Sequence, residues 1–309
     1  MFPYIVILAG GEGVRMKSRK AKVMHELMGK PIVEWVVDLA KSFSSNHIIL
    51  VYGKNNREVK ALFQGINYAL QPEPIGTGNA VSIALKEIHD EEGDVIVLSG
   101  DVPLLSEKTL RELITHHKEN NCDATLLTFS SPEPTGYGRI IRDGGEIKAI
   151  VEEKDATSDQ KKIREVNGGI YIFSLKHLRK ALKSLSTDNN QSEYYLTDVI
   201  SLIQKDGSRI EGIKTCRPWE LQGINTREDL SKVIEILRRR KIADVQERGV
   251  TILLPETVYI EPQVEIGKDT IIYPNTVIRG DTFIGSECII GPFVHLMDEK
   301  IPSGSIIQN

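Results

Sequence analysis

The stretch YIVILAGGEGVRM, residues 4–16, decides the fold of the first part of the chain. Its apolar half, Tyr4–Ala9, predicts a buried strand, and two glycines follow at once. In an open α/β sheet, ligands bind beyond the carboxyl ends of the strands, and glycines let backbone N–H groups approach a phosphate closely. Arg15 can hold phosphate oxygens with paired hydrogen bonds, and Lys22 can add a point charge. We therefore expect a phosphate-binding turn here.

Two common phosphate-binding motifs do not fit this turn. The run G-x-x-x-x-G-K-[ST] of the P-loop is not present in the sequence. The dinucleotide fingerprint G-x-G-x-x-G lacks its third glycine, because Met16 stands in that position. A tight turn without a ligand is the alternative interpretation, and the two basic residues favour phosphate.

Apolar runs and amphipathic stretches alternate after the turn. Strands are expected over residues 47–52, 94–99 and 124–129, and helices over residues 31–43, 78–89 and 106–119. This alternation predicts a mostly parallel sheet that is covered by helices on both faces. Three further strands without helices between them are expected over residues 139–142, 147–152 and 169–173. They fit hairpin insertions at an edge of the sheet.

A long helix is expected over Thr226–Arg248, capped by Thr226 with Asp229 in a capping box and ended by Gly249. It carries the basic run of residues 238–241. Such a run on a helix usually forms a solvated face, and a site for an anionic partner is the minor alternative.

The hydrophobic period changes to six in the last part of the chain. Aliphatic residues recur in phase at Ile260, Ile266, Ile272, Ile278, Ile284, Ile290 and Leu296. The positions four residues later are small or β-branched. This pattern is typical of a hexapeptide β-helix, in which each hexapeptide forms one face of a triangular coil. The repeats cover about two coils, so we expect them to pack on the long helix, the main domain or neighbouring subunits.

Composition and charge exclude several classes of protein. The formal net charge of -4 argues against a general nucleic-acid binder, and no apolar run approaches the ~20 residues of a membrane span. Cys122, Cys216 and Cys288 lie far apart, which suits reduced thiols rather than disulfides or zinc. We expect a cytoplasmic protein without nucleic-acid or membrane partners.

Motifs in order over residues 8–225 resemble one enzyme family. They are LAGGEGVRM (8–16), KVMHEL (22–27), GKP (29–31), Gln71 with GTG (76–78), GDVPL (100–104), GYGRI (136–140), VEEKD (151–155), VNGGIY (166–171), EYYLTD (193–198) and GIN (223–225). This series resembles the sugar-nucleotide pyrophosphorylases, a nucleotidyltransferase family, and most closely their N-acetylglucosamine-1-phosphate uridylyltransferase branch. The resemblance implies a Rossmann-like nucleotidyltransferase domain over residues 1–225, a linker helix over 226–249 and a short left-handed parallel β-helix over 250–309.

The resemblance also implies a role for individual residues. The nucleotide would be held by Leu8, Ala9, Gly10, Gly11, Gln71, Gly76 and Thr77. The sugar would be held by Gly138, Glu152, Asn167, Tyr195 and Thr197. Mg²⁺ would be bound by Asp101 and Asn225, and catalysis would depend on Arg15 and Lys22. Taken alone, Asp101 also fits a turn or helix cap, and the polar sugar residues also fit solvated strand edges.

The implied reaction joins UTP and N-acetylglucosamine-1-phosphate, releasing pyrophosphate, by an in-line displacement assisted by Mg²⁺. Its product is a precursor of the cell wall. Since the attacking sugar phosphate is already an oxyanion, no general base is needed. Two alternatives stay open. The first is uridylyl or thymidylyl transfer to glucose-1-phosphate or another hexose-1-phosphate, and the second is a sensor that binds nucleotide-sugar without catalysis.

The chain departs from the usual pattern of the branch at three positions. Gly10 stands where a second alanine is frequent, Ser99 where an aromatic residue is frequent, and Gly168 where threonine is frequent. We expect the last two to change contacts near the sugar.

Many relatives in this branch also transfer acetyl groups through a long C-terminal β-helix. Here His295 is the sole histidine after residue 177, and we expect no acetyltransferase activity. Hexapeptide β-helices commonly form trimers, so the resemblance implies a homotrimer, with a monomer or dimer left open.

Overall fold

The computed structural model describes residues 3–44 and 46–308, which form two compact units. The first unit holds residues 3–25 and 32–225, and the second holds residues 26–31 and 226–308. Within the described residues, no helix is both long and apolar enough to cross a lipid bilayer. Each unit has its own apolar core and is described separately below.

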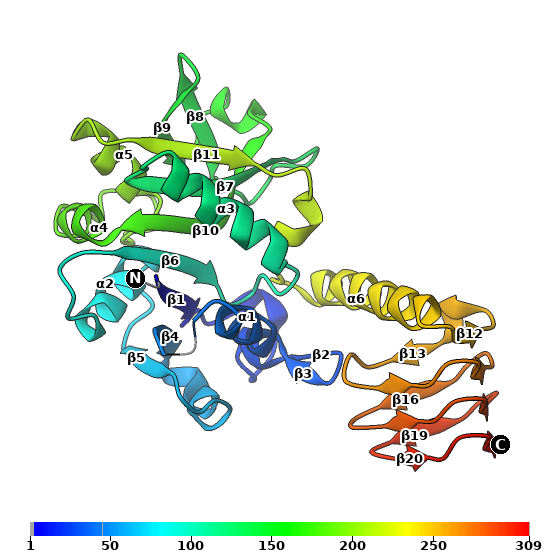
Figure 1. Cartoon of the computed structure of the whole chain (residues 1–309). Coiled ribbons are helices and arrows are strands. Elements are labelled where there is room, and N and C mark those ends of the chain that lie inside the picture. Colours follow the sequence, from blue (N-terminus) through cyan, green and yellow to red (C-terminus); the bar gives the residue numbers. More distant parts are fainter. Residues whose placement is uncertain (1–2, 45, 309) are drawn as a thin grey trace. The chain divides into compact units, whose positions relative to one another are not determined.

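The first unit is built on one large mixed sheet (Figure 1). Its main strands are β1 (Tyr4–Ala9), β4 (Ile48–Gly53), β5 (Asn67–Gln71), β6 (Asp94–Ser99), β7 (Ala124–Ser130), β10 (Glu165–Ser174) and β11 (Ile210–Lys214). They lie in the order β11-β7-β10-β6-β1-β4-β5. All neighbours are parallel except β10, which runs antiparallel to both β6 and β7. The prediction of a mostly parallel sheet is therefore confirmed.

Helices cover both faces of this sheet, as the alternation predicted. One face packs against α1 (Ile32–Lys41) and α3 (Glu107–Glu119), which bury apolar residues in the same core cluster. The other face packs against α2 (Thr77–Ala84), α4 (Leu175–Leu182) and α5 (Asp198–Lys205). The expected helix over 78–89 ends earlier, because α2 gives way to a 3₁₀ turn at Leu85–Glu87. Since the faces are covered, the strand ends remain for ligand binding.

Of the three strands expected at an edge of the sheet, residues 139–142 and 147–152 form a hairpin as predicted, whereas the placement of residues 169–173 was wrong. The strands β8 (Arg139–Asp143) and β9 (Glu146–Val151) form an antiparallel hairpin, and β8 meets β10 where Arg139 pairs with Val166. In contrast, β10 lies in the middle of the sheet, between β6 and β7. Residues 170–173 are almost completely buried, and a strand of this kind must be covered on both faces.

The second unit begins with α6 (Arg227–Glu247), whose start follows the prediction. Thr226 Oγ1 accepts a hydrogen bond from Asp229 N at 3.1 Å, and Asp229 Oδ2 accepts one from Thr226 N at 2.9 Å. This is the expected capping box. Ile242 and Val245 of α6 are buried in the same cluster as the repeat residues, so the repeats do pack on this helix.

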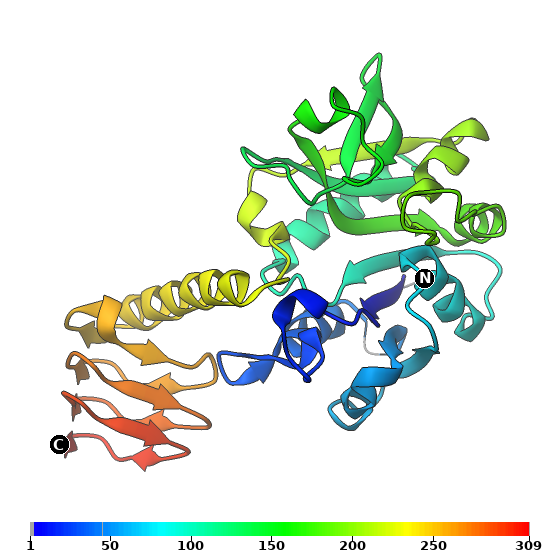
Figure 2. The ribbon, with the colours of Figure 1, turned by 180° about the vertical axis from the view of Figure 1, so that it is seen from behind.

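The repeats form a parallel β-helix with three sheets (Figure 2). Its strands are β12 (Thr251–Ile252), β13 (Tyr259–Ile260), β14 (Glu265–Ile266), β15 (Ile271–Ile272), β16 (Val277–Arg279), β17 (Phe283–Ile284), β18 (Ile289–Ile290), β19 (His295–Met297), β20 (Lys300–Ile301) and β21 (Ile306–Ile307). Of the in-phase aliphatics, Ile260, Ile272, Ile278, Ile284 and Ile290 are fully buried and stack in the interior. The hexapeptide prediction is confirmed, and the architecture agrees with the expected left-handed β-helix.

The β-helix is longer than the expected two coils. One sheet has four strands, β12-β15-β18-β21, and the other two have three each among the described residues. The strand β12 of the first coil escaped detection because a 3₁₀ turn at Pro255–Thr257 separates it from the regular period that begins at Ile260. The last coil is one residue short: Glu265 pairs with Phe283, 18 residues on, but Phe283 pairs with Lys300, 17 residues on.

The basic run of α6 is only partly a solvated face, which corrects that interpretation. Arg238 Nη1 donates to Pro255 O at 2.6 Å and to Val258 O at 3.2 Å. Lys241 Nζ donates to Pro262 O at 2.8 Å and to Val264 O at 2.6 Å. These two side chains therefore cap backbone carbonyls of the first coil, since one helical turn puts them on the same side of α6.

A small hairpin also belongs to the second unit. It consists of β2 (Glu26–Leu27) and β3 (Lys30–Pro31), which are antiparallel. Arg279 Nη2 donates to Glu26 Oε1 at 2.6 Å, and Arg279 Nε donates to the buried Glu261 at 2.8 Å. The hairpin is thus held to the β-helix by an ion pair.

Candidate active site

A cleft of about 470 Å³ opens beyond the carboxyl ends of β1, β5 and β6. This is where an open α/β sheet binds its ligands. The lining residues are Leu8, Ala9, Gly10, Gly11, Glu12, Gly13, Val14, Arg15, Lys22, Val23, Gln71, Pro74, Gly76, Thr77, Ala80, Ser99, Asp101, Glu193 and Asn225. The set includes every residue predicted for the nucleotide, the metal and catalysis.

The glycine-rich turn shapes one wall of the cleft. Gly13 has a φ of +64°, and a Cβ atom there would lie 2.4 Å from the Cβ of Lys22. Only glycine allows this close approach. At Gly11, by contrast, an added Cβ would meet no atom within 4 Å. The turn therefore brings Lys22 against the loop and leaves open space above Gly11.

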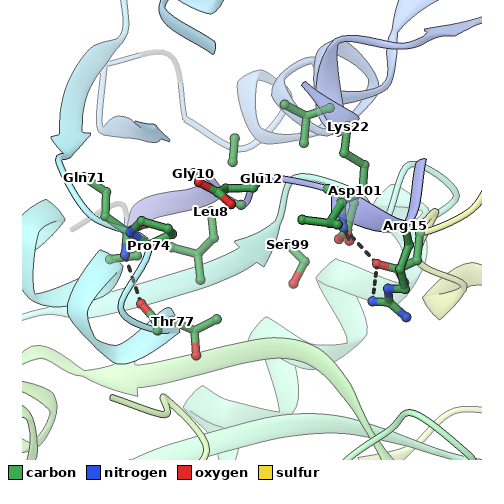
Figure 3. A pocket seen from close by; sticks show the side chains of 18 of the residues that line it. Leu8, Gly10, Glu12, Arg15, Lys22, Gln71, Pro74, Thr77, Ser99 and Asp101 are labelled. Carbon is green, nitrogen blue, oxygen red and sulfur yellow. Dashed lines mark hydrogen bonds and ion pairs between the residues drawn. The ribbon is translucent and has the colours of Figure 1, made fainter. Parts of the chain in front are cut away.

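Charged and amide groups gather at one end of the cleft (Figure 3). Lys22 Nζ lies 2.5 Å from Asp101 Oδ2 and donates to Asn225 Oδ1 at 2.9 Å. Arg15 Nη2 donates to the same Asn225 oxygen at 2.9 Å. The Lys22 and Asp101 side chains are only 14% and 20% exposed, so their attraction is less screened than that of a surface pair.

The donor atoms at this end fit a magnesium ion. Oδ2 of Asp101 and Oδ1 of Asn225 converge on a single cation, the Lys22 ammonium. Two hard oxygens with room for water and phosphate oxygens are what Mg²⁺ prefers in phosphate-transferring sites. No group of three or more His, Cys, Asp and Glu side chains is arranged to hold a metal within the described part of the chain. Asp101 and Asn225 would supply two of the ligands of a magnesium ion here, and water and phosphate oxygens would complete the set.

The other end of the cleft is built around the amide of Gln71, which is 5% exposed. Its Nε2 donates to Gly76 O at 3.0 Å and to Asn79 Oδ1 at 3.2 Å. Gly76 has a φ of +111°, and a Cβ atom there would lie 2.4 Å from Tyr194 O. Thr77 at the start of α2 accepts a hydrogen bond from Leu196 N at 3.0 Å. These contacts fix the orientation of the Gln71 amide.

The five predicted sugar residues do not line the cleft but form a neighbouring cluster. Thr197 Oγ1 donates to Glu152 Oε1 at 2.9 Å, and a Cβ atom at Gly138 would lie 3.6 Å from that same oxygen. Asn167 Oδ1 accepts from Gly169 N at 3.1 Å, and Ser99 Oγ donates to Gly169 O at 3.3 Å. Ser99 lines the cleft, so the cluster adjoins it through Gly169.

Burial changes the acidity of this cluster. Desolvation raises the pKa of the Glu152 carboxyl above its ordinary value, against the lowering effect of the Thr197 hydrogen bond. Desolvation also raises the pKa of Tyr195 to about 12, and Tyr195 accepts a hydrogen bond from Gln191 at 2.6 Å. Tyr195 and Thr197 are both buried. The cluster is therefore a polar region in which Tyr195 and Thr197 are buried and Glu152 and Asn167 are half-buried.

Sequence reasoning gave no role to several residues of the cleft, namely Glu12, Gly13, Val14, Val23, Pro74, Ala80 and Glu193, and it expected Ser99 only near the sugar. Five of these seven lie inside the recognised motifs, so the motifs themselves were the available signal, whereas Pro74 and Ala80 lie outside them. Gly168, one of the three positions at which the chain departs from the usual pattern of the branch, is tightly packed. A Cβ atom there would lie 2.6 Å from Leu221 Cδ1 and 2.8 Å from Leu127 O. A larger residue therefore has no room there.

Comparisons with known proteins match this chain to one family of nucleotidyltransferases. The family described as MobA-like NTP transferase domain matches residues 5–192. The bifunctional protein GlmU of Caldanaerobacter subterraneus subsp. tengcongensis is 44% identical over 97% of this chain and 65% of its own length. GlmU of Brevibacillus brevis is 42% identical over 99% of this chain and 67% of its own length. GlmU of Halalkalibacterium halodurans is 42% identical over 99% and 68%. The chain thus spans about two thirds of these relatives.

A solved structure also matches the fold. It is a Bacillus anthracis protein described as a glucose-1-phosphate thymidylyltransferase in complex with a sucrose. It superposes with a TM-score of 0.61 at 18% identity and covers 75% of this chain and 94% of its own. At this identity, the likeness concerns the fold alone.

Proposed function

The chain belongs to the MobA-like NTP transferase family and, within it, to the GlmU branch, and from this premise we propose that it transfers a uridylyl group from UTP to N-acetylglucosamine-1-phosphate. The products are UDP-N-acetylglucosamine and pyrophosphate. One observation carries the proposal: a single cleft has the Gln71 amide at one end and Arg15, Lys22, Asp101 and Asn225 at the other. A nucleoside triphosphate matches this arrangement, because its base can hydrogen-bond to an amide at one end and its charged phosphates can bind cationic side chains at the other.

In this proposal the nucleoside lies at the Gln71 end. The edge of a uracil base carries an N–H donor, which the amide oxygen of a glutamine can bind. Since both N–H groups of Gln71 Nε2 already donate, to Gly76 O and Asn79 Oδ1, Oε1 is the atom that would accept from the base. Backbone groups of Leu8–Gly11 would hold the nucleoside and its phosphates, because Gly10 and Gly11 allow the ligand to approach the backbone closely.

The phosphates extend toward the cationic end. Arg15 would hold the departing β- and γ-phosphates with paired hydrogen bonds, and Lys22 would offset the negative charge that builds up around the α-phosphorus. Asp101 and Asn225 would hold Mg²⁺, which supplies further positive charge to the phosphate oxygens. The sugar of the second substrate would lie against Gly138, Glu152, Asn167, Tyr195 and Thr197.

The reaction is an in-line displacement. An oxygen of the sugar phosphate attacks the α-phosphorus of UTP, a new P–O bond forms, and the bond to the pyrophosphate leaving group breaks. The attacking oxygen is already ionised, so no proton must be removed. Positioning and charge stabilisation by the residues above therefore supply the catalysis.

Pyrophosphate release tests the proposal. UTP is incubated with and without N-acetylglucosamine-1-phosphate, in Mg²⁺ and then in EDTA, beside Asp101→Ala. We expect release that depends on both sugar and metal and is lost in the variant. Glucose-1-phosphate and dTTP serve as the competing substrates, and faster turnover with either would reassign the specificity. Binding without turnover for every pair would make the chain a nucleotide-sugar sensor.

Acetyl transfer is tested separately. We propose that residues 1–225 carry the uridylyl transfer, that residues 226–249 link them to the β-helix at 250–309, and that this chain has no acetyltransferase activity. His295 lies exposed on β19, where it pairs in register with Val277. Formation of N-acetylglucosamine-1-phosphate from acetyl-CoA and glucosamine-1-phosphate by the purified chain would contradict this.

A further inference from the structure

Three adjacent strands end side by side at the Gln71 end of the cleft. The register pairs Ala9 of β1 with Tyr52 of β4, and Gly53 of β4 with Gln71 of β5. The Gly10 turn, Gly53 and Gln71 therefore follow one another along the same edge of the sheet.

Asn56 connects the first two of these strand ends. It lies in the 3₁₀ segment η3 (Lys54–Ala61), with a non-helical φ of -136° and ψ of 38°, and is 2% exposed. Its Nδ2 donates to Ala9 O at 2.7 Å, and its Oδ1 accepts from Gly53 N at 2.7 Å. One amide side chain thus holds a carbonyl of β1 and an N–H of β4 together.

The packing around this connection is tight. A Cβ atom on Gly53 would lie 2.7 Å from Gly10 O, and one on Gly10 would lie 2.5 Å from Gln71 Oε1. Contacts this short leave no slack between the three strand ends, because real Cβ atoms are essentially never found so close to another heavy atom. The position of Gln71 Oε1 therefore depends on where Asn56 holds Ala9 and Gly53.

We propose that Asn56 is a positioning residue for the nucleobase, a role that rests on the proposed uridylyl transfer. It holds the backbone of Ala9 and Gly53 so that Gly10 and the Gln71 amide keep the spacing that a pyrimidine edge requires. Asn56 itself does not line the main cleft, so it acts through these neighbours. Its effect falls on nucleotide binding and not on the chemistry at the α-phosphorus, which takes place at the Lys22 end.

The test compares Asn56→Asp with Asn55→Asp, which makes the same change at the exposed neighbouring residue. The aspartate at 56 keeps the acceptor for Gly53 N but places an oxygen against Ala9 O. We expect the KM for UTP and the dissociation constant of UTP, measured by calorimetry in Mg²⁺, to rise about tenfold or more, as loss of one buried hydrogen bond implies. The kcat and the KM for the sugar phosphate should change less than about threefold. Asn55→Asp should behave like the wild type.

A second variant covers the case in which Asn56→Asp does not fold. Gly53→Ala presses on Gly10 O from the other side, and Gly53 has an ordinary φ of -96°. It should give the same defect in UTP binding. An unchanged UTP KM and dissociation constant in the folded variants would reduce Asn56 to a structural role and overturn the inference. A wild-type chain that binds UTP but releases no pyrophosphate would instead overturn the proposed function, and the calorimetry would still decide the role of Asn56.

Discussion

Lys22 Nζ lies 2.5 Å from Asp101 Oδ2, and the same ammonium donates to Asn225 at 2.9 Å. Asp101 and Asn225 therefore share one positive charge. A divalent ion that takes both oxygens as ligands competes with the lysine for this position. Under the proposed function, metal binding by Asp101 and Asn225 would therefore free Lys22 to move toward the phosphates.

This competition predicts opposite effects of Lys22→Met on binding and on turnover. Removing the ammonium should strengthen the binding of Mn²⁺, used as a spectroscopic probe, about fivefold or more, since a charge at contact distance is worth at least ~1 kcal/mol. Turnover should fall by roughly a hundredfold to a thousandfold, as for other groups that stabilise developing charge. Electron paramagnetic resonance of Mn²⁺ and pyrophosphate release measure the two effects. Lys20→Met is the exposed control, and weaker Mn²⁺ binding by Lys22→Met would refute the competition.

The substitution Gly76→Ala is expected to lower both the stability of the protein and its affinity for UTP. In Gly76→Ala, a positive φ and a Cβ atom 2.4 Å from Tyr194 O should cost roughly 3 kcal/mol or more. The shift also moves Gly76 O, which accepts from Gln71. The Tm of thermal unfolding and the affinity for UTP should both fall. Gly65→Ala is the matched control: its φ is +74°, but its Cβ atom meets nothing within 4 Å, so it should lose only about 1 kcal/mol and keep its affinity for UTP. Equal losses in both variants would exclude the Tyr194 contact as the cause.

Local signals made part of the fold predictable. The end of β1 is followed directly by Gly10 and Gly11, and the capping box of α6 lies within four residues. Both features could therefore be located from short stretches of sequence. The β-helix was recognised for the same reason, since each hexapeptide repeats one local pattern. Its strands β12, β20 and β21 were missed because a 3₁₀ turn after β12 and a missing residue before β20 shift the period.

Features that depend on distant pairing could not be predicted. The central position of β10 depends on its partners β6 and β7, which lie far away in the chain. The polar run KNNREVK, residues 54–60, resembles an exposed loop, and nothing in it distinguishes buried Asn56 from exposed Asn55. The residues predicted for the nucleotide, the metal and catalysis came from ordered motifs and line one cleft, whereas Pro74 and Ala80 lie outside these motifs and were missed.

The substitution Glu152→Gln is expected to stabilise the protein relative to the wild type by an amount that depends on pH. Burial raises the pKa of this carboxyl in the folded state above its ordinary value of 4.5. Its contribution to stability is therefore fully present below about pH 4.5 and is lost as the pH rises through the raised pKa. Glu152→Gln keeps an acceptor for Thr197 and removes the charge. We expect the Tm of the variant to match the wild type near pH 4 and to exceed it increasingly as the pH rises through the raised pKa, in a series of thermal unfolding curves.

The control for this pH effect is Glu133→Gln, because Glu133 is exposed. Its Tm difference from the wild type should stay flat over the same pH range. If Glu152 contacts the sugar as proposed, the KM of Glu152→Gln for the sugar phosphate should rise although the protein becomes more stable. A Tm difference that falls with pH would mean that burial does not govern this carboxyl.

Lys241 and Arg239 stand two residues apart in one basic run but are predicted to differ in their effect on stability. Lys241→Met removes the donor to Pro262 O and Val264 O, which should destabilise the second unit by about 1–3 kcal/mol. Arg239 is 76% exposed and pairs with Glu235 at 2.6 Å, so Arg239→Met should cost no more than ~0.5 kcal/mol. Hydrogen–deuterium exchange of the first coil, residues 251–266, measures the difference without interference from the other unit. Faster exchange is expected in Lys241→Met alone. Equal exchange in both variants would mean that the run acts only as a solvated face, as the sequence pattern by itself indicated.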